Sequence, residues 1–182
     1  MLWQRLNDEK SRWHKTDIVI DGWLKERQQL LQLYMAAARL PSLQGKPSLP
    51  AIEVVERETF NTLCNTLVDY VSVLHFEILE QLSELERLLK EQLAKTKSPA
   101  SPEPKSPIPL GLNRPLLEKI LQTTNNILDF EIKCQDHLKD KKPLLDLKPA
   151  VSQLGEELAR RMDLEDALIH AYVWARTAKP HL

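Results

Sequence analysis

The chain has 182 residues, of which 25 are basic and 26 acidic, and this length suits one domain with a sizeable core better than two. Because the charges nearly balance, we expect no global electrostatic attraction to nucleic acid or to a membrane, so a partner must be recognised locally. The two cysteines, Cys64 and Cys134, are far apart in sequence and form no metal-ligand cluster. They are expected to be free, buried thiols in a reducing compartment, with no zinc bound.

The opening stretch MLWQRLNDEKSRWHK contains acidic residues and has no apolar run, unlike a signal peptide or a transit peptide. No later stretch is apolar over the length needed to span a bilayer. We therefore predict a cytoplasmic protein.

Leucine, glutamate, lysine and glutamine are abundant and only 4 glycines occur, which favours helices over turn-rich β structure. The 12 prolines fall mostly between the segments with helical periodicity. They divide the chain into four long predicted helices at 16–40, 53–95, 114–139 and 150–178, with a possible earlier helix at 2–14.

The stretch 95–115, KTKSPASPEPKSPIPLGLNRP, has the composition of a flexible extended linker and too few large apolar residues to pack. It separates the second predicted helix from the third. We predict a single all-α domain over 1–182, built as an up-down-up-down four-helix bundle in which the apolar stripes face a shared core.

The predicted helix 53–95 contains the stretch LVDYVSVLHF at 67–76, in which Asp69 and His75 interrupt an apolar run. Residues six positions apart on a helix point in different directions, so these two cannot form an acid–base pair here. The expected core stripe consists of Phe60, Leu63, Leu67, Val71, Leu74, Ile78, Leu82, Leu85 and Leu89. Asp69, Val73 and Phe76 lie on the opposite side, which suggests a docking patch of one charge among apolar groups. Alternatively, Phe76 covers the linker or the N-terminal segment.

Charged residues also occur within the apolar stripes of the other predicted helices. The positions expected to face inward are Ile20, Trp23, Leu24, Arg27, Leu31, Tyr34 and Ala38 in the first helix, Leu117, Leu121, Thr124, Leu128, Glu131 and Gln135 in the third, and Leu154, Leu158, Arg161, Glu165, Leu168 and Tyr172 in the fourth. An isolated buried charge costs several kcal/mol, so Arg27 and Arg161 should pair with Glu131 and Glu165. We predict an interior polar network with His75 at its edge. The alternative is that some of these side chains lie near the bundle ends and reach water.

Signatures of catalysis are missing from the sequence. There are no Glu-x-x-His pairs of the kind that hold two metal ions in helical bundles, and Asp166 with His170 has no third ligand. Serine hydrolase, phosphate-loop and dinucleotide-binding motifs do not occur, and no predicted helix has a basic DNA-reading face. We expect no enzyme activity, cofactor, metal or direct contact with nucleic acid.

Three blocks, in this order, resemble the Rsd/AlgQ family of small helical bacterial anti-sigma factors: IDGWLKERQQLL (20–31), LVDYVSVLHFEI (67–78) and LGEELARRMDLEDALI (154–169). Their motifs are Trp23-Leu24 followed by Arg27, Leu67-Val68-Asp69-Tyr70 followed by His75-Phe76, and Gly155-Glu156 leading to Arg161 and Leu164-Glu165-Asp166. The third predicted helix matches the family only loosely. The stretch 95–115 looks like an insertion, because the family usually has a shorter connection there.

The resemblance implies a protein that binds the C-terminal promoter-recognition domain of the housekeeping sigma factor, one to one, and blocks its contacts with core RNA polymerase and promoter DNA. That target is a basic helix-turn-helix domain, which an acidic, partly apolar face would complement. The expected contact residues are Asp69, Val73, Phe76, Glu77 and Glu80. A bundle scaffold tolerates many grafted surfaces, so another signalling or phosphotransfer protein is an alternative partner.

Overall fold

The computed structural model describes residues 2–47, 49–73, 87 and 114–177, and within them the side chains of 18, 20–47, 49–73, 87 and 115–170. Its elements are α1 (Leu2–Ala38), η1 (Ser42–Gln44), α2 (Pro50–Val73), α4 (Arg114–Lys139), η3 (Leu144–Leu147) and α5 (Lys148–Thr177). The predicted all-α class is confirmed, since the described residues include helices and no strand.

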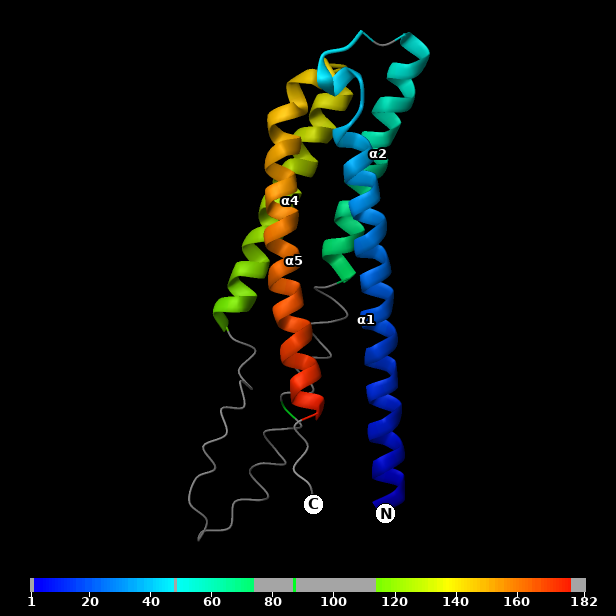
Figure 1. Cartoon of the computed structure of the whole chain (residues 1–182), viewed down its shortest axis with the longest axis vertical. Helices are drawn as coiled ribbons and strands as arrows, with labels where there is room; N and C mark the ends of the chain where they lie inside the picture. Colours follow the sequence, from blue (N-terminus) through cyan, green and yellow to red (C-terminus); the bar gives the residue numbers. More distant parts are fainter. Residues whose placement is uncertain (1, 48, 74–86, 88–113, 178–182) are drawn as a thin grey trace.

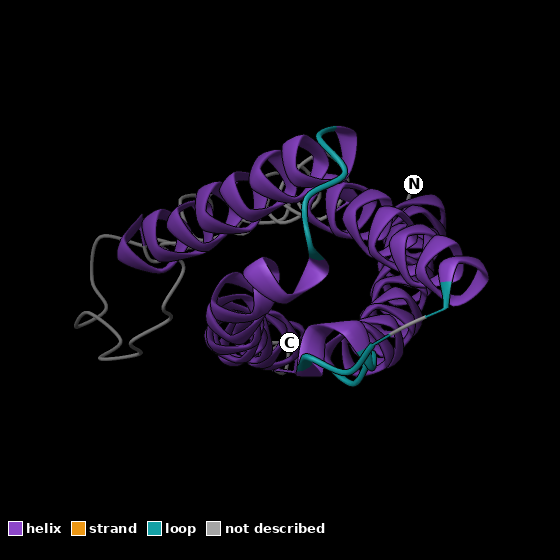
Figure 2. Cartoon of the chain, turned by 90° about the horizontal axis from the view of Figure 1, so that it is seen from above, coloured by secondary structure: helices purple, strands orange, loops and turns teal. Residues whose placement is uncertain are grey.

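Neighbouring helices of the described part run in opposite directions along one long axis (Figure 1). α1 lies beside α2, α4 lies beside α5, and α2 and α4 join the two pairs. Figure 2 looks along this axis and shows the helices around a shared interior, with loops at the near end. Most of the predicted linker 95–115 lies outside the described residues, so the full up-down-up-down connection stays a prediction.

The helix boundaries differ from the predicted ones at several points. α1 is continuous from Leu2 to Ala38, so no break separates a helix at 2–14 from one at 16–40. α2 and α5 begin earlier than expected, each with a proline in its first turn, where proline's missing N–H is tolerated. The part of the predicted helix 53–95 beyond Val73 lies outside the described residues, apart from residue 87.

The core takes its residues from every described helix. Its buried apolar members include Trp23, Leu30 and Ala37 of α1; Phe60, Leu63, Leu67 and Val71 of α2; Ile120, Ile127 and Cys134 of α4; and Val151, Leu154, Leu158 and Leu168 of α5. In α2 and α5 the buried residues follow the apolar stripes that the sequence predicts. Within the described residues no helix is both long enough and apolar enough to cross a membrane.

The predicted inward stripes of α1 and α4 were only partly right, because Trp23 is buried and Ile20, Tyr34, Ala38 and Leu128 pack against the core, but the centre of each buried face is rotated about the helix axis. Leu24 and Leu31 were expected to face inward but are 40% and 37% exposed, whereas Leu30 is completely buried. In α4, Leu121 is 51% exposed and its neighbour Ile120 is buried. Adjacent residues on a helix point in directions that differ by about 100°. Where two adjacent positions are both apolar, the periodicity of the sequence does not decide which of the two is buried.

The end of the bundle near η1 and η3 is held by polar contacts across the loops. The backbone N–H of Ser42 donates to Oε1 of the buried Glu56 at 3.2 Å. Nη2 of Arg57 donates to the carbonyl of Lys142 at 2.8 Å, which ties α2 to the loop after α4. Gly45 ends η1 with φ +73°, a left-handed conformation that glycine adopts without steric cost. These contacts fix the end of the bundle at which α2 begins.

Candidate functional site

The outer face of α2 carries the acidic residue Asp69. Asp69 and Thr62 are exposed and Val73 is half-buried, whereas Phe60 and Leu67 on the other side of the helix are buried. The structure therefore places Asp69 on the side turned away from the core. The other expected contact residues, Phe76, Glu77 and Glu80, lie outside the described residues, as does His75.

Directly behind Asp69, the next residue on α2 points into the bundle. Tyr70 is 1% exposed, and its hydroxyl donates a hydrogen bond to Oε2 of Glu165 on α5. The indole of Trp23 on α1 lies tilted against the Tyr70 ring, with 6.4 Å between the ring centroids. Tyr70 thus joins α2 to α1 and α5 at the level of Asp69, and sets how α2 is rotated at that point.

Arg161 of α5 is the centre of the polar interior. It is completely buried, and its Nε donates to Oε1 of Glu165 at 2.6 Å. Its Nη1 donates to the carbonyl of Ile120 and the hydroxyl of Thr123, both at 3.1 Å, and also to the hydroxyl of Thr124. Nη2 is buried and has no hydrogen-bond partner. These bonds offset part of the cost of burying the charge and connect α4 to α5.

Burial controls the proton affinities of the groups around Arg161. It raises the pKa of Glu165 above the ordinary range, while the charge of Arg161 and the hydrogen bonds from Tyr70 and Arg161 oppose this. Burial, together with the nearby Glu165 carboxylate, raises the pKa of the Tyr70 hydroxyl. Tyr70 therefore keeps its proton and acts as a hydrogen-bond donor.

Arg27 lies at the rim of this network and has a different partner from those predicted. Its Nη1 donates to Oδ1 of Asp166 at 2.6 Å, linking α1 to α5. The Arg27 side chain is 16% exposed and that of Asp166 is 53% exposed. Glu131 is half-buried on α4. The pKa of Cys64 is raised mainly by the contact with Cys134 and by burial, and the charge of Glu131 adds to this. Of the predicted network, the structure pairs Arg161 with Glu165 and places Arg27 at its edge.

Comparison with known proteins gives the family. A model of the family described as "Regulator of RNA polymerase sigma(70) subunit, Rsd/AlgQ" matches residues 1–173. The chain belongs to the Rsd/AlgQ family. The members of this family are regulators of the sigma-70 subunit.

Two similar relatives are both named Regulator of sigma D. The one from Pectobacterium carotovorum subsp. carotovorum (strain PC1) is 29% identical over 154 residues, covering 83% of this chain and 85% of the relative. The one from Yersinia enterocolitica serotype O:8 / biotype 1B (strain NCTC 13174 / 8081) is 26% identical over 178 residues, covering 97% of this chain and 93% of the relative. No solved structure matches the chain.

The blocks that resemble the Rsd/AlgQ family contain most of the side chains that meet inside this bundle. The block 20–31 contributes Arg27, the block 67–78 contributes Tyr70, and the block 154–169 contributes Arg161, Glu165 and Asp166. These three segments are far apart in the sequence and are brought together by the packing of α1, α2 and α5. The blocks therefore describe one structural unit that lies behind the outer face of α2.

Sequence reasoning missed three members of this polar interior, Tyr70, Thr123 and Asp166, whereas Thr124 was expected to face inward but was assigned no partner. Tyr70 follows Asp69 directly, so its position about 100° around the helix indicates an inward direction. Two adjacent threonines within a helix are a further signal, because their hydroxyls can serve a buried donor. Asp166 was considered as a metal ligand beside His170 and set aside for lack of a third ligand, and in the structure it is exposed and pairs with Arg27.

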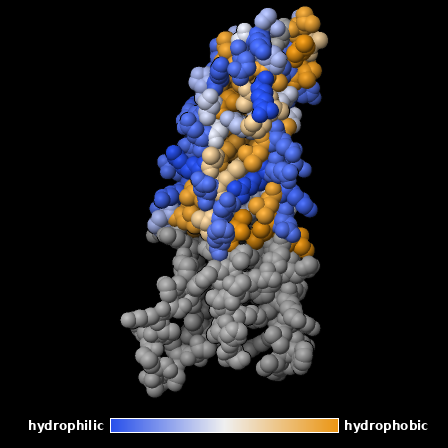
Figure 3. Space-filling view, in the orientation of Figure 1, coloured by the Kyte–Doolittle hydropathy of each residue, from blue (hydrophilic) through white to orange (hydrophobic). Residues whose placement is uncertain are grey.

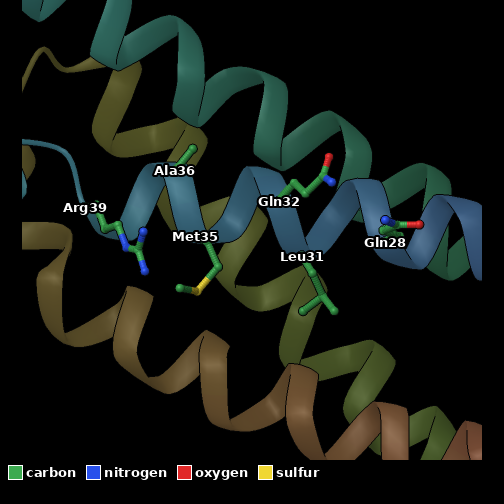
Figure 4. Close-up of a pocket in the computed structure, with 6 residues that line it drawn as sticks. All are labelled: Gln28, Leu31, Gln32, Met35, Ala36 and Arg39. Carbon is green, nitrogen blue, oxygen red and sulfur yellow. The ribbon is translucent and has the colours of Figure 1, made fainter.

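A second surface feature of this Rsd/AlgQ member is a hollow on the outer side of α1, with a volume of about 530 Å³. Its lining residues are Gln28, Leu31, Gln32, Met35, Ala36 and Arg39. Figure 4 looks onto this face of α1 and shows Leu31 and Met35 directed toward α5 at one edge, and Gln32 and Ala36 directed toward α2 at the other. The hollow bears one charged residue, a basic one, which distinguishes it from the outer face of α2.

Metal binding has no candidate site among the residues that the structure describes, because no three His, Cys, Asp or Glu side chains there could share an ion. The chemistry that the described surface of α2 offers is that of recognition, through an exposed carboxylate on a rigid helix.

Proposed function

We propose that this member of the Rsd/AlgQ family binds the C-terminal promoter-recognition domain of the housekeeping, sigma-70-class sigma factor, one to one, in the cytoplasm. Bound there, it blocks the contacts of that domain with core RNA polymerase and with promoter DNA. Transcription is then biased toward alternative sigma factors. The protein acts by occupying a surface, without catalysis, cofactor, metal or direct contact with nucleic acid.

The observation that carries this proposal is the exposed carboxylate of Asp69 on a rigid face of α2. Asp69 lies on α2 opposite the buried line Phe60, Leu63, Leu67 and Val71. A helix-turn-helix domain that binds DNA is basic, so an exposed acid on a rigid helix complements it. Support also comes from the family description, which names the sigma-70 subunit, and from the relatives named Regulator of sigma D.

The polar interior gives this surface its rigidity. Tyr70 is bound to Glu165, and Glu165 is bound to Arg161, so the segment of α2 that carries Asp69 is fixed to α5 from behind. A contact residue held in this way loses little conformational freedom on binding, which favours affinity. We assign Arg161 and Glu165 to the support of the docking surface, and Asp69 and Val73 to the surface itself. Phe76, Glu77 and Glu80 remain proposed contacts.

Isothermal titration with the isolated C-terminal domain of a sigma-70-class factor, at a low and a high salt concentration, tests the proposal. We expect saturable one-to-one binding that weakens with salt, because the acidic face and the basic domain attract each other electrostatically. If no binding occurs at either salt concentration, the proposed function is wrong, and another partner, such as a signalling or phosphotransfer protein, has to be sought.

A further inference from the structure

The N-terminal end of α2 exposes an unusual amount of apolar surface. Leu49, Ile52, Val54 and Val55 are 69%, 46%, 66% and 61% exposed, although all four fall within seven residues of sequence. In Figure 3, apolar surface gathers at the upper right, where Figure 1 places the start of α2. Single exposed apolar residues are common on protein surfaces, but a cluster of large ones marks a site of interaction.

This apolar end lies in line with Asp69. Val55 and Asp69 are 14 residues apart, which is close to four helical turns, so they share one side of α2 about 21 Å apart. Glu58, Thr62 and Asn65 lie between them at helical spacing, and all three are exposed. The outer side of α2 is thus one continuous strip, apolar at its beginning, mostly polar in the middle, and acidic near Asp69.

The charge on the strip has a single sign. The exposed residues of α2 include Glu58 and Asp69 and no lysine or arginine. Arg57, the basic residue of this helix, is folded back against the bundle, where it bonds Glu53 at 2.7 Å and the Lys142 carbonyl at 2.8 Å. Its side chain is 20% exposed. The strip therefore offers apolar contact and negative charge together, which suits a basic partner with an apolar patch.

Interface size decides how much of the strip such a partner would use. A stable complex usually buries about 800 Å² on each partner, and most of its binding energy comes from apolar side chains near the centre. Among the described residues near Asp69 on the outer side of α2, Thr62 and Asn65 are polar and Val73 is half-buried, so this part alone supplies little of the apolar contact that such a complex needs. We infer that the apolar start of α2 (Ile52, Val54 and Val55), together with Leu49 just before the helix, is the second half of the docking surface for the sigma-factor domain. This inference rests on the proposed function.

The test compares three variants of the full-length protein in titrations with the C-terminal domain of a sigma-70-class factor. The double variant Val54→Ser/Val55→Ser should bind about tenfold more weakly than the wild type, because two apolar contacts are lost. The loss of affinity in this double variant should be the same at low and high salt, since salt does not screen apolar contacts. Asp69→Ala should also weaken binding, but with a smaller loss at high salt.

Met35→Ser is the matched control. Met35 is 44% exposed in the α1 hollow, so this variant removes a similar apolar surface from a different face (Figure 4). It should bind like the wild type. Circular dichroism of every variant checks that the helices are retained, which is expected because all the substituted residues are exposed or partly exposed.

The outcomes separate the two proposals. Wild-type binding that Asp69→Ala weakens and Val54→Ser/Val55→Ser does not would overturn this inference and leave the proposed function standing. If only Met35→Ser lowers the affinity for the sigma-factor domain, the docking surface lies on α1 and the inference is wrong as well. A wild-type dimer in light scattering that becomes monomeric in the double variant, with unchanged sigma affinity, would assign the patch to self-association instead. A wild type that does not bind refutes the proposed function, and this inference with it.

Discussion

The hydroxyl of Tyr34 on α1 lies directly over Gly155 on α5. A Cβ added to Gly155 would overlap the Tyr34 oxygen and come within 2.9 Å of its Cζ, and the same hydroxyl donates to the carbonyl of Val151 at 3.2 Å. The missing side chain therefore lets the two helices approach and gives Tyr34 a hydrogen-bond acceptor. Arg27 and Asp166 join the same pair of helices farther along α5.

Gly155→Ala should destabilise the protein by about 1–3 kcal/mol, because Tyr34 has to move and loses its bond to Val151. Urea unfolding measures the change in the free energy of unfolding. Adding Tyr34→Ala removes the clash, so the double variant should lose much less than the sum of the two single variants. An increase in stability for Gly155→Ala alone, as expected from helix propensity by itself, would contradict the steric explanation.

Arg161→Met and Arg27→Met should have very different effects on stability. Arg161 is completely buried, so its removal leaves Glu165 buried beside Tyr70 without its hydrogen-bonded cation and should cost about 3–5 kcal/mol. Arg27 pairs with an exposed carboxylate at the rim, where an ion pair contributes about 0–1 kcal/mol. Chemical denaturation of both variants against the wild type tests this contrast. If both variants lose the same free energy of unfolding, the contribution of each arginine to stability does not depend on how deeply it is buried.

The pKa of Asp166 should be lower than its ordinary value of 3.8, because Arg27 donates a hydrogen bond to the ionised form. A lowered pKa in the folded state favours the ionised carboxylate. Its contribution to stability is therefore present above pH 3.8 and is lost as the pH falls through the folded-state pKa. NMR titration of the Asp166 carboxyl carbon measures this value, and Arg27→Met should return it toward 3.8. An unchanged pKa in that variant would rule out Arg27 as the cause.

Both cysteines should be unreactive in the folded protein. Cys64 and Cys134 are completely buried on neighbouring helices, and the contact with Cys134, followed by burial, raises the pKa of the Cys64 thiol. The thiolate is the reactive form, so alkylation should be slow in buffer and should modify both residues promptly in denaturant. Mass spectrometry counts the adducts. Rapid labelling of either thiol in buffer would show that α2 and α4 separate readily.

Asp69→Ala should weaken binding to the sigma-factor domain by about 1–3 kcal/mol, the usual range for losing a charged interface contact, while the fold is retained. Asp69 is exposed, so the truncation leaves no buried group without a partner. Asp163→Ala, which removes an exposed carboxylate from α5 instead of α2, is the matched control and should leave the affinity unchanged. A folded Asp69→Ala protein with unchanged affinity would remove this residue from the docking surface.

The sequence alone determined the helical class, the approximate helices and the side of α2 that faces outward. Helix-forming residues and the positions of the prolines define the helices, and in the second half of α2 the residues Phe60, Leu63, Leu67 and Val71 form one buried apolar stripe. Where a helical segment has a single apolar stripe, its rotation follows from periodicity, and this is why the pattern of that half of α2 is sufficient to place Asp69 at the surface.

The tertiary structure decided the rotation of α1 and α4 and the partners of the charged residues. α1 has apolar residues on adjacent lines, so only packing against α2 and α5 selects Leu30 over Leu31 as the buried one. Arg27 finds Asp166, and Tyr70 finds Glu165, across 139 and 95 residues of sequence. Hydrogen bonds between distant segments depend on how far each helix is shifted along its neighbours. Side-chain packing fixes these shifts. Because packing leaves no periodic signal in the sequence, the shifts could not be predicted from it.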